Sequence, residues 1–240
     1  MSASFEELDY RQTPLGELTL RRRRVRELED LEVFEVKLGD AFLMSSLFHK
    51  VEVALADLGL ALLDAPHLDV VVGGLGLGYT ARAALKHPAL GSLLVVDFMA
   101  AVIEWHEKGL VPLGPELTAD PRCRFVLGDF FALAAAPELG FDPNAPGRLF
   151  HAVLLDIDHS PKNLLHLRHG AFYSEAGLRK LALQLHPRGI FALWSDDPPD
   201  ADFLATLGLV FEECEAKVVS FFNPLLERNS SSTVYLARNS

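Results

Sequence analysis

Cysteine and long apolar runs are scarce in this chain of 240 residues. The two cysteines, Cys123 and Cys214, are too few for a disulfide framework and lack the spacing of metal ligands. No uncharged apolar run approaches the roughly 20 residues that a membrane helix needs. The acidic start MSASFEELDYRQ does not resemble a secretory signal. We therefore expect a cytoplasmic protein with no membrane partner.

Positive charge is also in short supply, because the formal net charge is −11. This balance argues against a nucleic-acid partner and favours a cationic ligand. The exception is the stretch RRRRVR at residues 21–26. Acidic residues surround it, so we interpret it as a strand with cationic side chains on an exposed or edge face, and not as a phosphate site.

What the sequence has in quantity is apolar residues, at 50%, which indicates a globular protein. Short β-segments fill residues 1–45, with turn signals at TPLG and at Gly39-Asp40. A helix-period stretch, LFHKVEVALADLGLALL, follows and ends near Pro66. We therefore divide the chain into a small β-domain with its linking helix, residues 1–66, and a second domain, residues 67–240.

The second domain alternates apolar strands with helices, which predicts a parallel sheet covered on both faces. One long helix is expected over AFYSEAGLRKLALQLHP, and a loop over GLVPLGPELTADP. Two final strand-like runs, LVFEECEAKVVSFF and SSTVYLAR, are joined too briefly for a crossover and predict an antiparallel hairpin at the sheet edge. The fold class is α/β, a doubly wound, mostly parallel, Rossmann-like sheet.

Four glycines, Gly73, Gly74, Gly76 and Gly78, follow the first parallel strand. A missing Cβ lets a ligand lie against the backbone at this position. Asp97 ends the next strand, where a carboxylate can accept hydrogen bonds from two ribose hydroxyls. These residues predict a nucleoside site.

The spacing of the glycines decides between two ligand classes. A dinucleotide site needs G-x-G-x-x-G or -A, and Tyr79 stands at the last position. G-x-G-x-G fits instead, as in folds that bind S-adenosylmethionine. A dinucleotide, or a glycine turn without a ligand, remains an alternative. Asp129 ends the third strand and can bind an adenine amino group, cap the helix FFALAAAP, or do both.

The fourth strand ends in acids, in the stretch LFHAVLLDIDHSPKN. Asp156 is our candidate catalytic residue, since a carboxylate at this edge can hold a cationic amine and take its proton. Strand alternation predicts that Asp158 shares its side, opposite Ile157, and raises the pKa of one member of the pair. Asp158, His159 and Tyr173 are candidate substrate contacts, although loop capping and core packing remain open.

A metal site is a further alternative at this place, because His166 and His169 follow the acids in the sequence. The spacing matches no closed metal-binding motif. We expect these two histidines to be loop or helix-start residues at the surface, and we assign no metal ligand.

The motifs GGLGLG, VVDF, GDFF and LLDIDHSP, followed by FYSEAGLRKLALQLHPRGIFALWS, resemble the spermidine synthase group of aminopropyltransferases. The resemblance covers roughly residues 30–200. It implies a seven-stranded class I methyltransferase fold and a small N-terminal β-domain. It also implies that Asp156 is the catalytic base, because it matches the first Asp of the family's D-S-S-D-P stretch.

The departures from that family bear on the substrate. Gly76 stands where the family has the acid that holds the amine of decarboxylated S-adenosylmethionine. Its loss makes intact S-adenosylmethionine admissible. His159 replaces the second Asp of D-S-S-D-P, and FHKVE, residues 48–52, has Lys50 where Y-H-E has Glu. The family's diamine contacts are therefore not reproduced.

We expect a transferase that moves an alkyl group from a sulfonium nucleoside to a small-molecule amine. Methyl transfer from S-adenosylmethionine is favoured narrowly over aminopropyl transfer from decarboxylated S-adenosylmethionine. A nucleoside-binding interaction protein without activity is disfavoured by Asp156, and an NAD-dependent oxidoreductase by Tyr79. Exposed β-segments near the N-terminus make a homodimer plausible.

Overall fold

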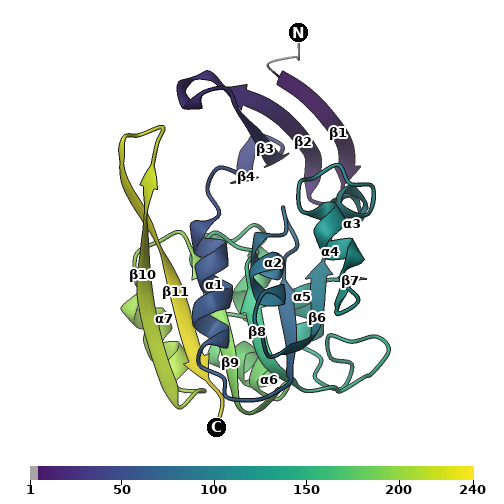
Figure 1. Cartoon of the computed structure of the whole chain (residues 1–240). Helices are drawn as coiled ribbons and strands as arrows, with labels where there is room; N and C mark the ends of the chain where they lie inside the picture. The colour runs from purple at the N-terminus through teal and green to yellow at the C-terminus, as the bar shows by residue number, and fades with distance from the viewer. Residues whose placement is uncertain (1–4) are drawn as a thin grey trace.

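The computed structural model of the chain describes residues 5–240 and contains a small and a large β-sheet (Figure 1). The small sheet is a four-stranded antiparallel meander. Its strands are β1 (Phe5–Thr13), β2 (Gly16–Val25), β3 (Leu31–Leu38) and β4 (Ala41–Ser45). Both predicted hairpin turns are present, since β1 and β2 meet at Thr13–Gly16 and β3 and β4 at Leu38–Ala41.

The arginine-rich stretch lies on β2, inside the small sheet and not at its edge. The Nε atoms of Arg21 and Arg23 each lie 2.7 Å from an oxygen of the buried Glu35 on β3. Arg22 pairs with Glu6 on β1. The interpretation as a cationic strand face is confirmed, and acids on both neighbouring strands pair with three of its arginines, Arg21, Arg22 and Arg23.

The large sheet has seven strands in the order β10-β11-β9-β8-β5-β6-β7. The strands are β5 (Leu68–Gly73), β6 (Leu90–Asp97), β7 (Cys123–Leu127), β8 (Phe150–Leu155), β9 (Leu185–Ser195), β10 (Glu213–Asn223) and β11 (Arg228–Arg238). Strands β5 to β9 run parallel, whereas β11 pairs antiparallel with β9, and β10 with β11. The predicted seven-stranded sheet with an antiparallel edge hairpin is confirmed.

Helices cover both faces of the large sheet, and each face has its own apolar core. One core includes α1 (Lys50–Leu60), α2 (Tyr79–Leu85), α3 (Ala100–Glu107) and α4 (Gly114–Ala119). The other includes α5 (Phe130–Ala134), α6 (Glu175–Ala182) and α7 (Ala201–Gly208). Val70, Val71 and Val72 on β5 are fully buried between them. This burial explains why the parallel strands read as continuous apolar runs.

Two local expectations were wrong. Residues 109–121, expected to form a loop, contain α4, which begins with a proline in its first turn. The long helix expected at 171–187 is instead a short 3₁₀ turn, Leu167–Ala171, followed by α6. Ser174 caps α6 through its Oγ, which accepts the Gly177 N–H, and β9 already begins at Leu185, where it pairs with Phe150 on β8.

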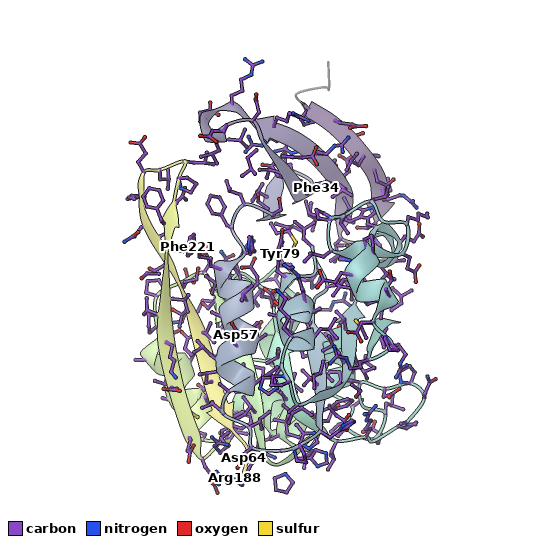
Figure 2. The ribbon with its side chains drawn as sticks, in the orientation of Figure 1. Phe34, Asp57, Asp64, Tyr79, Arg188 and Phe221 are labelled. Atoms are coloured by element: carbon purple, nitrogen blue, oxygen red, sulfur yellow. The ribbon has the colours of Figure 1, made fainter. Side chains whose placement is uncertain are left out.

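The small sheet lies over the carboxyl ends of the parallel strands, and the tip of the β10–β11 hairpin rises beside it (Figure 1). The indole N–H of Trp105 on α3 donates to Asp9 on β1 at 2.7 Å, which ties the small sheet to a helix of the large domain. Tyr79 and Phe221 lie at the level of the space between the sheets, whereas Asp64 and Arg188 lie at the far end of the molecule (Figure 2).

No helix among residues 5–240 is long and apolar enough to cross a membrane.

Candidate functional site

A cavity of about 430 Å³ lies between the small sheet and the carboxyl ends of the parallel strands. Its volume is within the range of small-molecule sites. Its roof comes from the small sheet, its floor from the glycine loop and the ends of β6 to β9, and one side from the β10–β11 hairpin and the start of α1. The predicted residues that line it are Gly74, Gly76, Asp97, Asp129, Asp156 and His159.

The glycine loop shows why these positions lack a side chain. Gly74 has a φ of +94°, and a Cβ there would collide with the carbonyl oxygen of Asp156. Gly76 has a φ of +48°, and the thioether of Met44 from the small sheet occupies the space of its missing Cβ. Gly73 and Gly78 are not on the cavity wall, because they pack against Phe130 and Leu117 respectively. Only two of the four predicted glycines can therefore face a ligand.

Asp97 holds the glycine loop in place at the end of β6. Its carboxylate accepts the N–H of Leu75 at 2.9 Å and the N–H of Met99 at 2.7 Å. Burial raises the pKa of the Asp97 carboxyl, and these backbone N–H groups oppose that rise. A half-buried carboxylate that is held by the backbone and lines the cavity fits the predicted contact with two ribose hydroxyls, which remains a prediction.

Asp129 is placed for both of its expected roles. It caps α5, since its Oδ1 accepts the N–H groups of Phe131 at 3.0 Å and Ala132 at 3.2 Å. It also lines the cavity, one strand away from Asp97. The helix cap is observed, and the contact with an adenine amino group remains a prediction.

Asp156 directly follows the last residue of β8 and forms part of the cavity floor. Its N–H donates to the carbonyl oxygen of Gly73 at 2.8 Å, and its Oδ2 accepts the Thr80 hydroxyl at 2.8 Å. Burial raises its pKa to about 6, although the Thr80 hydroxyl lowers it. Among residues 5–240 this carboxylate forms no ion pair. It is therefore available to a cation that enters the cavity.

Glu52 is a site residue that the sequence reasoning missed. It lies in the first turn of α1 and shares the cavity wall with Asp156. Burial, and then the charge of Asp156, raise its pKa to about 8. One feature of the sequence could have indicated Glu52: it is an acidic residue in the first turn of the helix, next to the buried Val51. The family resemblance instead aligns Lys50 with the family's glutamate and assigns no role to Glu52.

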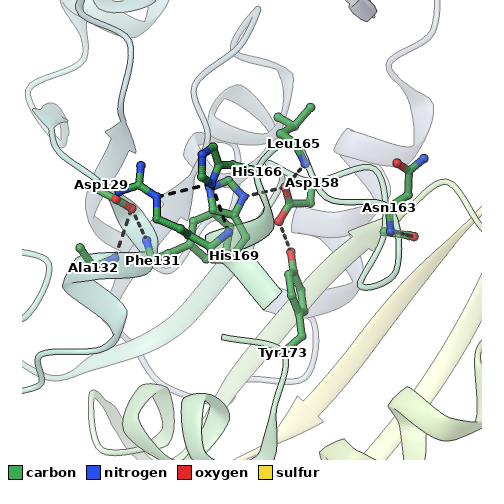
Figure 3. A network of polar contacts seen from close by, with 11 residues as sticks. Asp129, Phe131, Ala132, Asp158, Asn163, Leu165, His166, His169 and Tyr173 are labelled. Carbon is green, nitrogen blue, oxygen red and sulfur yellow. Dashed lines mark hydrogen bonds and ion pairs between the residues drawn. The ribbon is translucent and has the colours of Figure 1, made fainter. Parts of the chain in front are cut away.

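Asp158 does not share the side of Asp156, and that expectation was wrong. Strand β8 ends at Leu155, so strand alternation does not continue into the acids, and Asp156 and Ile157 both line the cavity. The Asp158 carboxylate is buried and accepts from Leu165 N–H at 2.7 Å and Tyr173 O–H at 2.9 Å (Figure 3). It also lies 2.8 Å from the Nδ1 atom of His169. Its partners are therefore within the protein.

Tyr173 lies away from the cavity, whereas His159 and His169 both line it. Tyr173 packs in the core and reaches Asp158, not the cavity. His159 lines the cavity, and its carbonyl oxygen accepts the N–H of Asp196 at 2.7 Å. His169 also lines the cavity and stacks on Phe131 with ring centroids 3.9 Å apart. The expectation of a surface position for His169 was therefore wrong, because Asp158 turns its ring inward.

No group of three His, Cys, Asp or Glu side chains within residues 5–240 is arranged to hold a metal ion. A second unforeseen residue, His106, supports the glycine loop instead. Its Nε2 lies 2.9 Å from the carbonyl oxygen of Gly76, and burial lowers its pKa to about 4. The ring is therefore neutral at pH 7, and its Nε2–H donates to that carbonyl. His106 could not be found by motif, because it contacts the loop only in the folded chain.

The arrangement combines two subsites. Gly74, Asp97 and Asp129 form a row at the ends of β5, β6 and β7, which suits a nucleoside. Asp156 and Glu52 line the same cavity as this row and are the carboxyl groups that an amine would meet. The geometry is that of a site where a nucleoside and a cationic amine can be brought together.

The chain was compared with protein-family models and with proteins of known function. No family model matches the chain. Polyamine aminopropyltransferase 2 of Pseudomonas aeruginosa is 29% identical over 191 residues, which cover 74% of this chain and 49% of that protein. The chain thus spans about half the length of this curated relative.

Solved structures give the fold. A spermidine synthase in complex with the transition-state analogue AdoDATO matches 98% of this chain and 72% of its own, with a TM-score of 0.72 and 16% identity. Human methyltransferase-like protein 13 in complex with SAH matches 80% of this chain and 82% of its own, with a TM-score of 0.54 and 19% identity. The resemblance read from the motifs is confirmed: this chain has the spermidine-synthase-like form of the class I methyltransferase fold, with its small N-terminal sheet.

Proposed function

We propose that this protein transfers an aminopropyl group from decarboxylated S-adenosylmethionine to a small-molecule amine. The observation that carries the proposal is the meeting of the nucleoside row with Asp156, a carboxylate without an ion-pair partner among the described residues, in one cavity. The sequence similarity to a polyamine aminopropyltransferase supports the type of group transferred.

The residues present fit a sulfonium nucleoside. Gly74 leaves the backbone open to the cavity, and the Asp97 carboxylate can accept the ribose hydroxyls. Asp129 is placed at the neighbouring strand end for the base. The donor supplies an electrophilic carbon and a neutral thioether leaving group, so the site needs no acid to protonate the leaving group.

Asp156 would hold the ammonium group of the acceptor and take one of its protons. The freed nitrogen lone pair then forms the new C–N bond while the C–S bond breaks, and the electron pair of that bond stays on sulfur. Holding both reactants in one cavity supplies a further part of the rate by proximity. Thr80 fixes the Asp156 carboxylate through its hydroxyl during this step.

Methyl transfer, the expectation drawn from Gly76, is less well supported. It rests on the loss of the acid that would repel the carboxylate of intact S-adenosylmethionine, and this loss makes the intact donor admissible without selecting it. The Met44 thioether occupies the space of the missing Gly76 side chain, with its Sδ lying 3.1 Å from the N atom of Leu77. The sequence relative is an aminopropyltransferase, and the methyltransferase neighbour supports the fold alone.

The proposal predicts that Asp156→Asn lowers the rate of amine-dependent 5′-methylthioadenosine formation by about 10²–10⁴-fold, because the acceptor loses its base. Binding of 5′-methylthioadenosine should stay within a few-fold of the wild-type value, since the nucleoside row is untouched. The measurement is a chromatographic assay with a panel of aliphatic amines, together with calorimetry. Equal rates in the two proteins would exclude Asp156 as the base.

A further inference from the structure

Glu52 and Asp156 form an acidic pair that nothing in the described chain neutralises. Glu52 comes from α1 on one face of the large sheet, and Asp156 from the loop after β8. Both line the same cavity, and each is only partly exposed, toward that cavity. Neither forms an ion pair among residues 5–240, and the Asp156 side chain accepts one hydrogen bond, from Thr80. Two carboxylates in such a place repel each other when both are ionised.

Other charged groups share the cavity but do not offset this pair by direct contact. Lys50 precedes Glu52 by two residues on the same helix, so the two side chains do not face each other. Asp97 and Asp129 have backbone N–H partners, and His169 is held by Asp158. The cavity is also lined by His159 after β8, Arg168 before α6 and Asp196 after β9, and the charge of Glu52 raises the pKa of Tyr79 on α2.

We propose that Glu52 and Asp156 together hold one proton at neutral pH, and that the ammonium group of the acceptor displaces this proton when it binds. Glu52 is then a second carboxylate of the acceptor site. This inference rests on the proposed function for the identity of the incoming cation. The pKa directions agree with it, because burial raises both values and the charge of Asp156 raises that of Glu52 further.

In the free protein Glu52 is a carboxylic acid and Asp156 a carboxylate. When the ammonium binds between them, Glu52 releases its proton to solvent, and the cation is held by two carboxylates. During transfer the amine gives one proton to Asp156, its lone pair forms the C–N bond, and the product leaves as a secondary ammonium ion.

The site therefore recognises an acceptor by a positive charge placed between two carboxylates. A neutral isostere, such as an alcohol in place of the amine, would leave the proton on Glu52 and gain no charge attraction. Acceptor affinity should rise with pH between about 6 and 8, since below this range the ammonium must displace more protons.

The test counts protons. Isothermal calorimetry with 1,4-diaminobutane as the probe, in the presence of 5′-methylthioadenosine at pH 7, is run in two buffers of different ionisation enthalpy. The wild-type protein should release about 1 proton per bound diamine, and Glu52→Gln about 0.1, from pKa values of about 8 for Glu52 and 6 for Asp156. The control Glu107→Gln, at the exposed end of α3, should match the wild type.

Equal proton release from wild type and Glu52→Gln would overturn the inference. A second measurement keeps it testable without a ligand. Infrared titration of the free protein should show a protonated carboxyl at pH 7 that Glu52→Gln lacks, and its presence in both proteins would also overturn it. Failure of the diamine to bind would refute the displacement. The expected proton release on diamine binding, without amine-dependent cleavage of decarboxylated S-adenosylmethionine, would refute the proposed function. The inference that Glu52 and Asp156 share a proton would then still hold.

Discussion

The residues of the cavity differ in how far their positions follow from local rules. Asp97 and Asp129 directly end or follow parallel strands, so strand ends alone place both at the cavity. Gly74 and Gly76 follow β5, and the sequence predicts their backbone freedom. Glu52 is different, because its partner Asp156 is remote in the chain and only the packing of α1 on the sheet brings the two together.

Gly74 gives a prediction at this scale. Gly74→Ala should destabilise the fold by about 2–4 kcal/mol, because its φ of +94° disfavours a side chain and a Cβ would collide with the Asp156 carbonyl oxygen. Gly39→Ala is the matched control, since its φ is +56° but no atom lies within 4 Å of the added Cβ, and it should cost about 1 kcal/mol. Urea unfolding measures both. Equal losses would mean that the close contact at Gly74 has no energetic consequence.

At the scale of elements, the loop between β8 and α6 is where sequence reasoning failed most. The sequence pattern predicts alternation past Leu155, where β8 ends, and a helix that begins before the Ser174 cap. Both errors have one cause: Asp158 organises the intervening segment as a buried acceptor for a backbone N–H and two side chains. Such a network depends on the folded loop and leaves no periodic signal.

The loop between β8 and α6 gives a prediction about Asp158. Asp158→Ala should cost about 2–4 kcal/mol of stability, because it leaves several buried polar groups without their acceptor. It should also weaken binding of 5′-methylthioadenosine several-fold, since His169 and its stacking partner Phe131 line the cavity. Tyr173→Phe removes one of these hydrogen bonds and should cost about 1 kcal/mol with unchanged nucleoside binding. Thermal unfolding and calorimetry decide; unchanged nucleoside binding in Asp158→Ala would refute the positioning role.

At the scale of the whole molecule, the small sheet lies over the carboxyl ends of the parallel strands (Figure 1). Its residues form the roof of the cavity. The α/β architecture, the alternation of strands with helices and the antiparallel edge hairpin could be predicted from the sequence. The periodicity of apolar residues and the turn signals that indicate them are local features of the chain. How the small sheet docks could not, since it depends on contacts such as Trp105 with Asp9 and Met44 with the glycine loop. Those contacts join segments that are distant in the chain.

Docking of the small sheet gives a pH-dependent prediction. Burial raises the pKa of Asp9, whereas hydrogen bonds from Trp105 and Arg11 and the charge of Arg11 lower it. The lowering effects are larger together, so the pKa of Asp9 lies below the usual 3.8. A lowered carboxyl pKa means that the ionised form stabilises the fold at neutral pH and that this stability is lost as pH falls through the lowered value. Asp9→Asn should therefore reduce the midpoint of thermal unfolding at pH 7 and differ less from wild type below pH 3. An equal difference at both pH values would contradict this account.

Aminopropyl transfer is tested most directly by a comparison of the two donors. The purified protein is incubated with decarboxylated or with intact S-adenosylmethionine, each with the same panel of aliphatic amines. Products are identified by mass spectrometry. Our account predicts that decarboxylated S-adenosylmethionine yields 5′-methylthioadenosine and an aminopropylated amine, and that Asp156→Asn suppresses both. A methylated amine from intact S-adenosylmethionine, with the decarboxylated donor left unreacted, would contradict it.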